Sequence, residues 1–270
     1  YCKMGLKTIA VLHDAFFWES PAHYHPLWLK LFHLIGVPAA KKADLLIVPT
    51  QHAKKTILAN AAFNPNKMKV VLEAAKSFHH TTIGPRPFET PYFLHVGVLE
   101  KRKNLVRLVE AFAQLHAVHP EYKLVLVGNT PVKLQLNDAP AIEDTITKLG
   151  LQEAVVRLGY LEADALATIY AHAFAYCLPS LNEGFGLPVL EAFHFKLPLI
   201  CANASALPEV AGDAALFFDP NDTTSISAAM LQLVENPNLV NQLIEKGQSR
   251  QLHFSWHKAA QEIHELMQGC

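Results

Sequence analysis

One stretch of the sequence combines residue types that could bind an anion. Residues 174–194 read F-A-Y-C-L-P-S-L-N-E-G-F-G-L-P-V-L-E-A-F-H, an apolar strand ending at Pro179, then a glycine loop, then a helix opening near Pro188. Free amides at a helix start, with the positive end of the helix dipole behind them, favour a phosphate. Gly184 and Gly186 let the backbone approach such a ligand without Cβ obstruction. The stretch therefore predicts a phosphate site at a strand-to-helix junction.

Two carboxylates bracket this element, Glu183 in the loop and Glu191 about one turn inside the helix. A helix rises about 1.5 Å per residue, which places Glu191 roughly 6 Å below the loop. One carboxylate could then address a sugar hydroxyl while the other accepts two hydrogen bonds from a ribose diol. Taken alone, Glu183 is more readily interpreted as a turn residue and Glu191 as an ordinary helix-surface charge. Their joint placement around a glycine loop favours the binding interpretation.

Two further groups follow strands. Arg102 and Lys103 lie between a strand and a helix that we expect Asn104 to cap. Positive charge there, beside the carboxyl edge of a sheet, would stabilise a diphosphate leaving group; the alternative is a solvated basic turn. His13 and Asp14 stand at the end of the first strand, where a local hydrogen-bonded turn is the alternative to an active-site role. Asp14 would orient His13 or cap the next element.

The segment E-G-F-G-L-P-V-L-E fits a Glu-x7-Glu motif and strongly resembles the retaining glycosyltransferases of family 4, also called group 1. The resemblance continues upstream in H-V-G-V-L-E-K-R-K-N-L-V-R-L-V-E-A-F and downstream in A-S-A-L-P-E-V-A-G-D-A-A-L-F-F-D-P. It covers nearly all of residues 92–256 and, more faintly, residues 8–80. Three matched blocks in the right order are far more specific than a lone glycine motif.

The resemblance implies roles for individual residues. Lys103 and Arg102 would hold the donor diphosphate, and Arg102 would partly replace an arginine that many relatives carry where Val98 stands here. Glu183 would contact the transferred sugar, and Glu191 would bind the ribose hydroxyls. His13 would be the active-site histidine that faces the donor sugar. The path between the two carboxylates would be lined by the backbone amides of Gly184, Phe185, Gly186 and Leu187.

The expected reaction moves a hexose, with mannose as the leading candidate, from a nucleoside-diphosphate sugar to a glycan or lipid-linked acceptor. The donor would be a GDP- or UDP-sugar bound as substrate, with no further cofactor. We expect no metal, because no Asp-x-Asp pair could bridge a diphosphate. Substitution would occur on one face of the sugar, and the leaving phosphate would take the acceptor's proton. The alternatives are an epimerase or phosphorylase of the same fold, and a module that only binds nucleotide sugars.

The elements that must position these residues alternate between short apolar runs and longer helical patterns, which is typical of parallel βαβ units. The fold class is therefore α/β, and the resemblance implies GT-B, two Rossmann-like doubly wound domains. Residues 1–88 would form an incomplete acceptor-side domain and residues 89–251 the nucleotide-sugar domain. A C-terminal helix in residues 252–270 could cross back to the first. Because Tyr1 is not an initiator Met, we interpret the chain as N-terminally incomplete.

Composition limits the partners. Lys and Arg number 23 against 24 Asp and Glu, a balance that argues against a nucleic-acid binder. The four cysteines form no C-x-x-C pair, which favours a reducing compartment. With no signal peptide and a sugar-nucleotide donor, we expect a cytoplasmic protein.

The apolar residues 27–40 favour a buried or interface helix. The alternative is that this segment docks on a bilayer at the inner face of the membrane, or on a partner.

Overall fold

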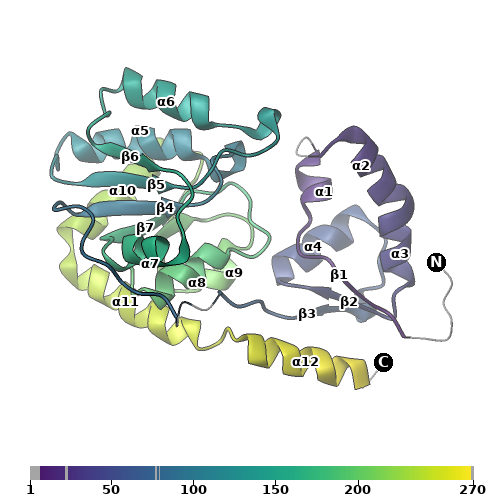
Figure 1. Ribbon diagram of the computed structural model, residues 1–270. Helices are drawn as coiled ribbons and strands as arrows, with labels where there is room; N and C mark the ends of the chain where they lie inside the picture. The colour runs from purple at the N-terminus through teal and green to yellow at the C-terminus, as the bar shows by residue number, and fades with distance from the viewer. Residues whose placement is uncertain (1–6, 22–23, 77, 79, 269–270) are drawn as a thin grey trace. The chain divides into compact units, whose positions relative to one another are not determined.

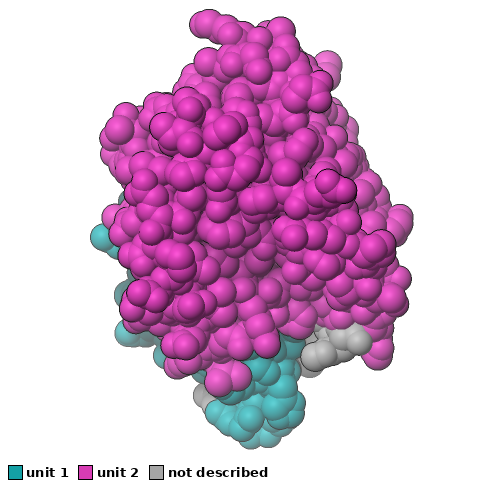
Figure 2. Space-filling model, turned by 90° about the vertical axis from the view of Figure 1, so that its left-hand side faces the viewer, with its two compact units in different colours: residues 1–74, 183–186, 254–270 teal, residues 75–182, 187–253 magenta. Residues whose placement is uncertain are grey.

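The apolar runs predicted as strands form two separate parallel sheets in the computed structural model (Figure 1). The structure describes residues 7–21, 24–76, 78 and 80–268. Each sheet belongs to one of two compact units (Figure 2). The first unit contains residues 1–74, 183–186 and 254–270, and the second contains residues 75–182 and 187–253. The domain ranges expected from the sequence, with boundaries after residues 88 and 251, stay a prediction.

The first unit is built on a sheet of order β1-β2-β3. Its elements are β1 (Ile9–Val11), α1 (Phe16–Glu19), α2 (Pro26–Leu31), the π-helix η2 (Phe32–Gly36), α3 (Val37–Lys42), β2 (Leu45–Val48), α4 (Gln51–Asn60), the 3-10 helix η3 (Pro65–Lys67), β3 (Met68–Val70) and α12 (Trp256–Gln268).

Alternation along β2 gives this sheet two apolar faces, because successive side chains of a strand point to opposite sides. Leu46 and Val48 pack in one core with Ile57 of α4. Leu45 and Ile47 pack in the other with Ala259 of α12. The C-terminal helix therefore covers one face of the N-terminal sheet.

The second unit is a doubly wound sheet of order β6-β5-β4-β7-β8-β9, with helices on both faces (Figure 1). Its strands are β4 (Tyr92–Val96), β5 (Lys123–Val127), β6 (Val155–Leu158), β7 (Ala175–Leu178), β8 (Leu199–Ala202) and β9 (Ala215–Phe218). Its helices are η4 (Lys101–Lys103), α5 (Leu105–His116), η5 (Leu134–Leu136), α6 (Ala139–Lys148), α7 (Ala163–Ala171), α8 (Leu187–His194), α9 (Leu207–Ala211), α10 (Thr223–Glu235) and α11 (Pro237–Gln251).

The α/β class and the parallel strand order confirm the predicted fold class. One helix extends beyond its expected range. The sequence predicts a helix over about 26–35, whereas helical structure continues through Lys42. The wide π turn Phe32–Gly36 precedes Pro38, which then occupies the second position of α3, where its missing N–H costs little.

Two further observations concern the expected compartment and membrane contact. Cys177 in β7 and Cys201 in β8 are buried free thiols, whereas Cys2 and Cys270 lie outside the described residues. Within the part of the chain that the structure describes, no helix is both long and apolar enough to cross a membrane.

Candidate functional site

The strand order of the second unit creates a place for a ligand between β4 and β7. From β4 the chain forms β5 and β6 on one side of that strand. It then returns to the other side of β4, where it forms β7, β8 and β9. In open parallel sheets, ligands bind beyond the carboxyl ends of the strands at such a switch point. The loop after β4, which carries Arg102 and Lys103, and the start of the loop after β7, as far as Asn182, lie together at this edge of the second unit.

Two glycines bring the loop after β4 against the end of β5. A Cβ on Gly128, whose φ is +140°, would lie 2.0 Å from the carbonyl oxygen of Gly97. The Gly97 amide also donates to the carbonyl of Val127 at 2.9 Å. Any side chain at position 128 would therefore push the loop away from its present path. Gly128 was not among the residues singled out from the sequence, although its place directly after a predicted strand was a usable signal.

Lys103 is almost fully buried, with 5% of its surface exposed, and its chain runs beside Gly97. If Gly97 carried a Cβ atom, that atom would lie 3.5 Å from Cε of Lys103 and 3.1 Å from Nε2 of the buried His95. The Nδ1 atom of His95 lies 2.9 Å from the carbonyl oxygen of Cys177. Because a carbonyl only accepts, Nδ1 carries the proton. Lysine is rarely buried in a protein interior without a specific reason, and its place at the switch point suits anion binding.

Arg102 connects the two loops. Its Nε lies 2.5 Å from a carboxylate oxygen of Glu100, and its Nη1 donates to the carbonyl of Asn182 at 3.1 Å. The amide of Leu181 donates back to the carbonyl of Arg102 at 2.8 Å. Glu100 thus shares the guanidinium charge, and Arg102 fixes the loop after β7 against the loop after β4. Its predicted contact with a diphosphate stays a prediction.

Asn104 occupies the N-cap position of α5, as expected, but its side chain does not cap the helix. It precedes the helix with φ 60° and ψ 35°, a left-handed conformation that asparagine tolerates, and its side chain makes no capping bond. Instead Nδ2 donates to the carbonyls of Pro179 at 3.2 Å and Pro220 at 2.7 Å. Its Oδ1 accepts from Arg107 at 2.6 Å. The buried asparagine therefore ties together the loops after β4, β7 and β9, a role that sequence spacing did not indicate.

Glu191 lies in α8 and is held from the neighbouring helix α7. One of its carboxylate oxygens accepts a hydrogen bond from the Tyr170 hydroxyl at 2.7 Å. Burial, together with the nearby Tyr176 and the carboxylate itself, raises the pKa of Tyr170 well above its usual value. The phenol therefore stays protonated and donates its hydrogen to the Glu191 carboxylate. This hydrogen bond fixes the orientation of the Glu191 carboxylate.

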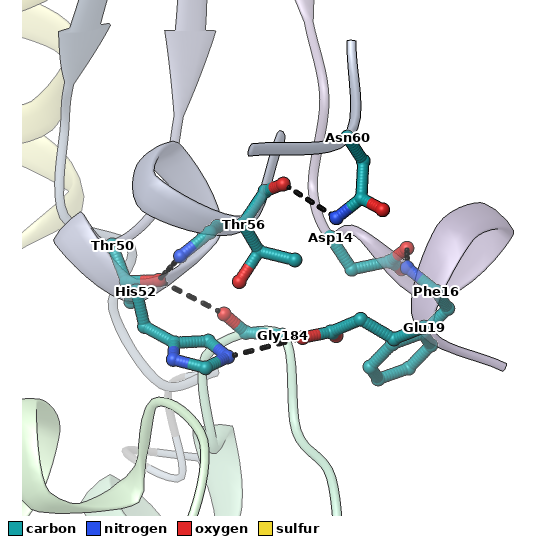
Figure 3. Close-up of polar contacts among 9 residues, drawn as sticks. Asp14, Phe16, Glu19, Thr50, His52, Thr56, Asn60 and Gly184 are labelled. Atoms are coloured by element: carbon teal, nitrogen blue, oxygen red, sulfur yellow. Dashed lines mark hydrogen bonds and ion pairs between the residues drawn. The ribbon is translucent and has the colours of Figure 1, made fainter. Parts of the chain in front are cut away.

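The segment Glu183–Gly186 packs within the first unit, where it lies against the ends of β1 and β2. Thr50, the N-cap of α4, donates its hydroxyl to the carbonyl of Gly184 at 3.3 Å, as Figure 3 shows. A Cβ on Gly184 would lie 2.9 Å from the carbonyl oxygen of His13 and 2.8 Å from the Cβ of Asp14. Glycine is therefore required at 184 for this close approach. Thr50 was missed, although a threonine before a helical pattern is a capping signal.

The structure brings His13 next to this loop and gives it a partner that was not predicted. Its Nδ1 lies 2.7 Å from a carboxylate oxygen of Glu73, while 72% of the His13 side chain is exposed. An unprotonated carboxylate accepts, so Nδ1 is the donor and Nε2 points away from Glu73. Asp14 accepts from the amide of Phe16 at 2.9 Å in the turn before α1 (Figure 3), but the N-cap of α1 is Ala15, so Asp14 is not the cap that was expected.

The predicted residues thus fall into two sets, one in each unit. The first unit carries His13, Glu183, Gly184, Phe185 and Gly186, and the second carries Arg102, Lys103, Leu187 and Glu191. Glu183 is buried, with 7% exposed, and Phe185 packs edge-on against Phe254 at 5.9 Å between ring centroids. Among the described residues, no group of three His, Cys, Asp or Glu side chains could hold a metal ion.

The chain is similar in sequence to a known family and to characterised enzymes. Residues 80–250 match the family described as Glycosyl transferases group 1. O-antigen chain mannosyltransferase B of Escherichia coli is 36% identical over 61% of this chain and 42% of its own length. MMP alpha-(1->4)-mannosyltransferase of Mycolicibacterium hassiacum is 33% identical over 96% of this chain and 64% of its own length. The chain therefore spans less than two thirds of either relative.

Solved structures share the fold. Anabaena HepE in complex with UDP-glucose superposes with a TM-score of 0.82 at 20% identity, covering 97% of this chain and 72% of HepE. Sucrose-phosphate synthase from Thermosynechococcus elongatus superposes with a TM-score of 0.79 at 21% identity, covering 97% of this chain and 67% of the synthase. At such identities the likeness concerns the fold alone, and it is the GT-B likeness that the sequence predicted.

Proposed function

Because the chain belongs to the group 1 glycosyl transferases, we propose that it is the donor-binding part of a retaining glycosyltransferase that moves a hexose from a nucleoside-diphosphate sugar to a glycan or lipid-linked acceptor. Mannose is the hexose we propose first, since both relatives described above are named mannosyltransferases. The proposed donor is GDP- or UDP-linked, and UDP-glucose is the ligand of the HepE complex described above. The proposed compartment is the cytoplasm, where sugar nucleotides are made.

The observation that carries the proposal is the buried Lys103 beside Gly97 at the switch point of the second sheet. An ammonium group there is suited to a diphosphate, whose negative charge grows as the sugar leaves. The amides that begin α8 supply further positive potential at the same sheet edge. Glu191, fixed by Tyr170, is suited to the ribose hydroxyls. These groups act by binding and positioning the nucleotide part of the donor.

The chemical step draws on residues of the first unit. Retaining hydrolases use two carboxylates about 5 Å apart, one of them a nucleophile. Glu191 is already assigned to the ribose, and Glu183 has no second carboxylate assigned beside it. We therefore favour substitution on one face of the sugar through an oxocarbenium-like state, in which the leaving phosphate accepts the acceptor's proton. Glu183 and His13 would stabilise and orient the transferred sugar.

The test combines a donor screen with one matched pair of variants. The chain would be titrated calorimetrically with GDP, UDP and ADP, and incubated with their sugars, with and without acceptor alcohols. Lys103→Met should weaken nucleoside-diphosphate binding by roughly tenfold or more, an amount typical of a lost charge-assisted contact. Lys101→Met, on the exposed side of the same short helix, should leave binding unchanged. Thermal unfolding of both variants checks that they fold.

Two results would contradict the proposal. Equal nucleotide affinity in both lysine variants would remove the diphosphate site from the switch point. A transferred sugar with inverted anomeric configuration, read by proton NMR, would exclude the retaining mechanism. Turnover of the sugar nucleotide without any acceptor product would favour the epimerase or phosphorylase alternative, and binding without turnover by the intact protein would favour a binding module.

A further inference from the structure

The chain first enters the second unit through a connection, residues 75–91, that precedes β4. Part of this connection is hydrogen-bonded to α7. The amide of Gly84 donates to Oγ1 of Thr168 at 2.8 Å, and the Gly84 carbonyl accepts from Nε2 of His172 at 3.1 Å. Thr168 and His172 lie four residues apart, so both face the same side of the helix. The connection is therefore held against α7 at a defined point.

Phe78 packs a second part of the connection into the second unit. Its side chain is buried, with 4% exposed. Its ring meets the ring of Tyr170 edge-on, with 6.2 Å between centroids, and the ring of Phe195 edge-on at 4.8 Å. Edge-to-face contacts of this kind are an arrangement that aromatic pairs prefer. The ammonium group of Lys76 lies 4.8 Å from the centroid of the Phe78 ring. Phe78 is thus enclosed by specific contacts.

The two rings that Phe78 meets belong to the group that orients Glu191. Tyr170 and Phe195 stack nearly parallel, with centroids 5.0 Å apart, and the Tyr170 hydroxyl donates to the Glu191 carboxylate at 2.7 Å. A smaller side chain at position 78 would leave a cavity beside both rings, and buried groups relax only in part toward such a cavity. A tilt of the Tyr170 ring moves its hydroxyl, and the Glu191 carboxylate loses its fixed orientation.

We propose that Phe78 is a positioning residue for the donor. It holds the Tyr170 ring in place, and Tyr170 orients the Glu191 carboxylate toward the ribose hydroxyls. The inference rests on the proposed function, in which Glu191 binds the ribose, and adds to it a residue that no sequence motif indicated. Binding effects of this kind are reciprocal, so bound nucleotide should stabilise the packing of Phe78 by the same factor by which Phe78 strengthens nucleotide binding.

Calorimetric titration with GDP and UDP compares two variants of the connection. Phe78→Leu keeps an apolar side chain but removes the ring, and should weaken nucleotide binding by roughly two- to tenfold, the range expected for a lost aromatic contact. Phe88→Leu is the matched control, because Phe88 lies in the same connection but meets Tyr92 instead, with 5.2 Å between centroids. The control should bind as the wild type does. Thermal unfolding checks that both variants fold. Unchanged affinity in Phe78→Leu, or equal losses in both variants, would overturn the proposal.

A double-mutant cycle distinguishes positioning from a general loss of stability. If Phe78 acts through Glu191, Phe78→Leu should cause no further loss of affinity in a Glu191→Ala background. A loss by the same factor in both backgrounds would show that Phe78 acts by another route. In carbon-13 NMR spectra without nucleotide, the Glu191 carboxyl signal, assigned by its absence in Glu191→Ala, should shift in Phe78→Leu and stay in place in Phe88→Leu. A signal that both variants leave in place would also contradict the proposal.

Hydrogen exchange at the Gly84 amide measures the reciprocal effect. Bound GDP or UDP should slow this exchange in the wild type, and should slow it less in Phe78→Leu. Exchange that nucleotide changes equally in both proteins, or in neither, would count against the inference.

The Lys103→Met variant separates this inference from the proposed function. If Lys103→Met weakens nucleotide binding while Phe78→Leu does not, the donor site stands and the role of Phe78 falls. If the wild type binds neither GDP nor UDP, the proposed function falls, and the role of Phe78 falls with it.

Discussion

The hydroxyl of Tyr170 donates a 2.7 Å hydrogen bond to a carboxylate oxygen of Glu191, so a fully buried phenol on α7 fixes an acidic group on α8. The same ring stacks on Phe195 and Tyr176, with centroids 5.0 and 5.6 Å apart. The carboxylate is therefore oriented by a residue that is itself locked by aromatic packing. If Glu191 binds the donor, Tyr170 is a positioning residue for that contact.

Tyr170→Phe keeps the ring and removes only the hydroxyl. We expect several-fold weaker nucleoside-diphosphate binding by calorimetry, because Glu191 gains rotamer freedom. The free energy of unfolding should fall by about 1.5 to 3 kcal/mol, the usual cost of a lost hydrogen bond to a charged group. Tyr92→Phe is the matched control, because the Tyr92 hydroxyl donates to the Ile169 carbonyl at 2.6 Å, away from the sheet's carboxyl edge. That variant should lose stability but bind nucleotide normally; equal binding losses in both would argue against the positioning role.

The two carboxylates of the glycine motif should separate binding from chemistry. Glu183→Ala should abolish sugar transfer with a modest loss of nucleotide affinity, whereas Glu191→Ala should mainly raise the donor KM. The reason is that Glu183 is assigned to the transferred sugar and Glu191 to the ribose. Steady-state kinetics with calorimetry measures both effects. Full activity in both variants would refute the two assignments.

Glu73 should decide which nitrogen of His13 carries the proton. Its carboxylate lies 2.7 Å from Nδ1 and accepts the hydrogen bond from that nitrogen. In nitrogen-15 NMR spectra, the His13 ring should show the Nδ1–H form in the wild type and a mixture of forms in Glu73→Ala, with roughly tenfold slower transfer. Glu73→Gln keeps a carbonyl oxygen as acceptor, so it should retain the Nδ1–H form. An unchanged tautomer in Glu73→Ala would remove Glu73 from this role.

Gly128→Ala should displace the loop after β4, and should destabilise the protein more than an alanine at another glycine position does. The new Cβ would lie 2.0 Å from the Gly97 carbonyl oxygen, so the loop that carries Lys103 must move. We expect a loss of stability above about 2 kcal/mol and loss of nucleotide binding. Gly150→Ala has a φ of +67° with open space around it, and should cost only about 1 kcal/mol with binding intact. Chemical denaturation and calorimetry on both variants make the comparison.

Cys177 and Cys201 should resist alkylation in the folded protein. Burial raises the pKa of both thiols, which lowers the thiolate fraction, and neither side chain is accessible. Iodoacetamide treatment followed by peptide mass spectrometry should find both unmodified until denaturant is added. Labelling of either residue at native stability would show that the second sheet opens locally.

The sequence predicted the strands and long helices well because their apolar periodicity is local. Apolar runs such as Tyr92–Val96 and Lys123–Val127 become central strands with the expected bounds. The short helices α1 and α9 were missed, since four or five residues hold too little periodicity to be read. The π turn Phe32–Gly36 was not predicted, and this wider turn ahead of Pro38 lets the helix continue into α3.

Side-chain partners across long stretches of sequence were the part that could not be predicted. Glu73 is 60 residues from His13, and Asn104 is 116 residues from Pro220. Only the fold brings these groups together, and no spacing rule links them. Asn104 illustrates the limit, because its residue type and place before α5 favoured a cap, while its left-handed backbone turns the side chain toward two loop carbonyls instead.

The packing of α12 on the N-terminal sheet has a consequence for biosynthesis. Ile263 and Leu266 cover Leu45, Ile47 and Val71, so one apolar face of the first sheet is completed by a helix that follows the whole second unit in sequence. During translation that face of the first sheet stays exposed until residue 266 has left the ribosome. The last strand of the second unit, in contrast, ends at residue 218. The two units should therefore mature in the reverse of their order of synthesis, and the first should be the one that depends on chaperones.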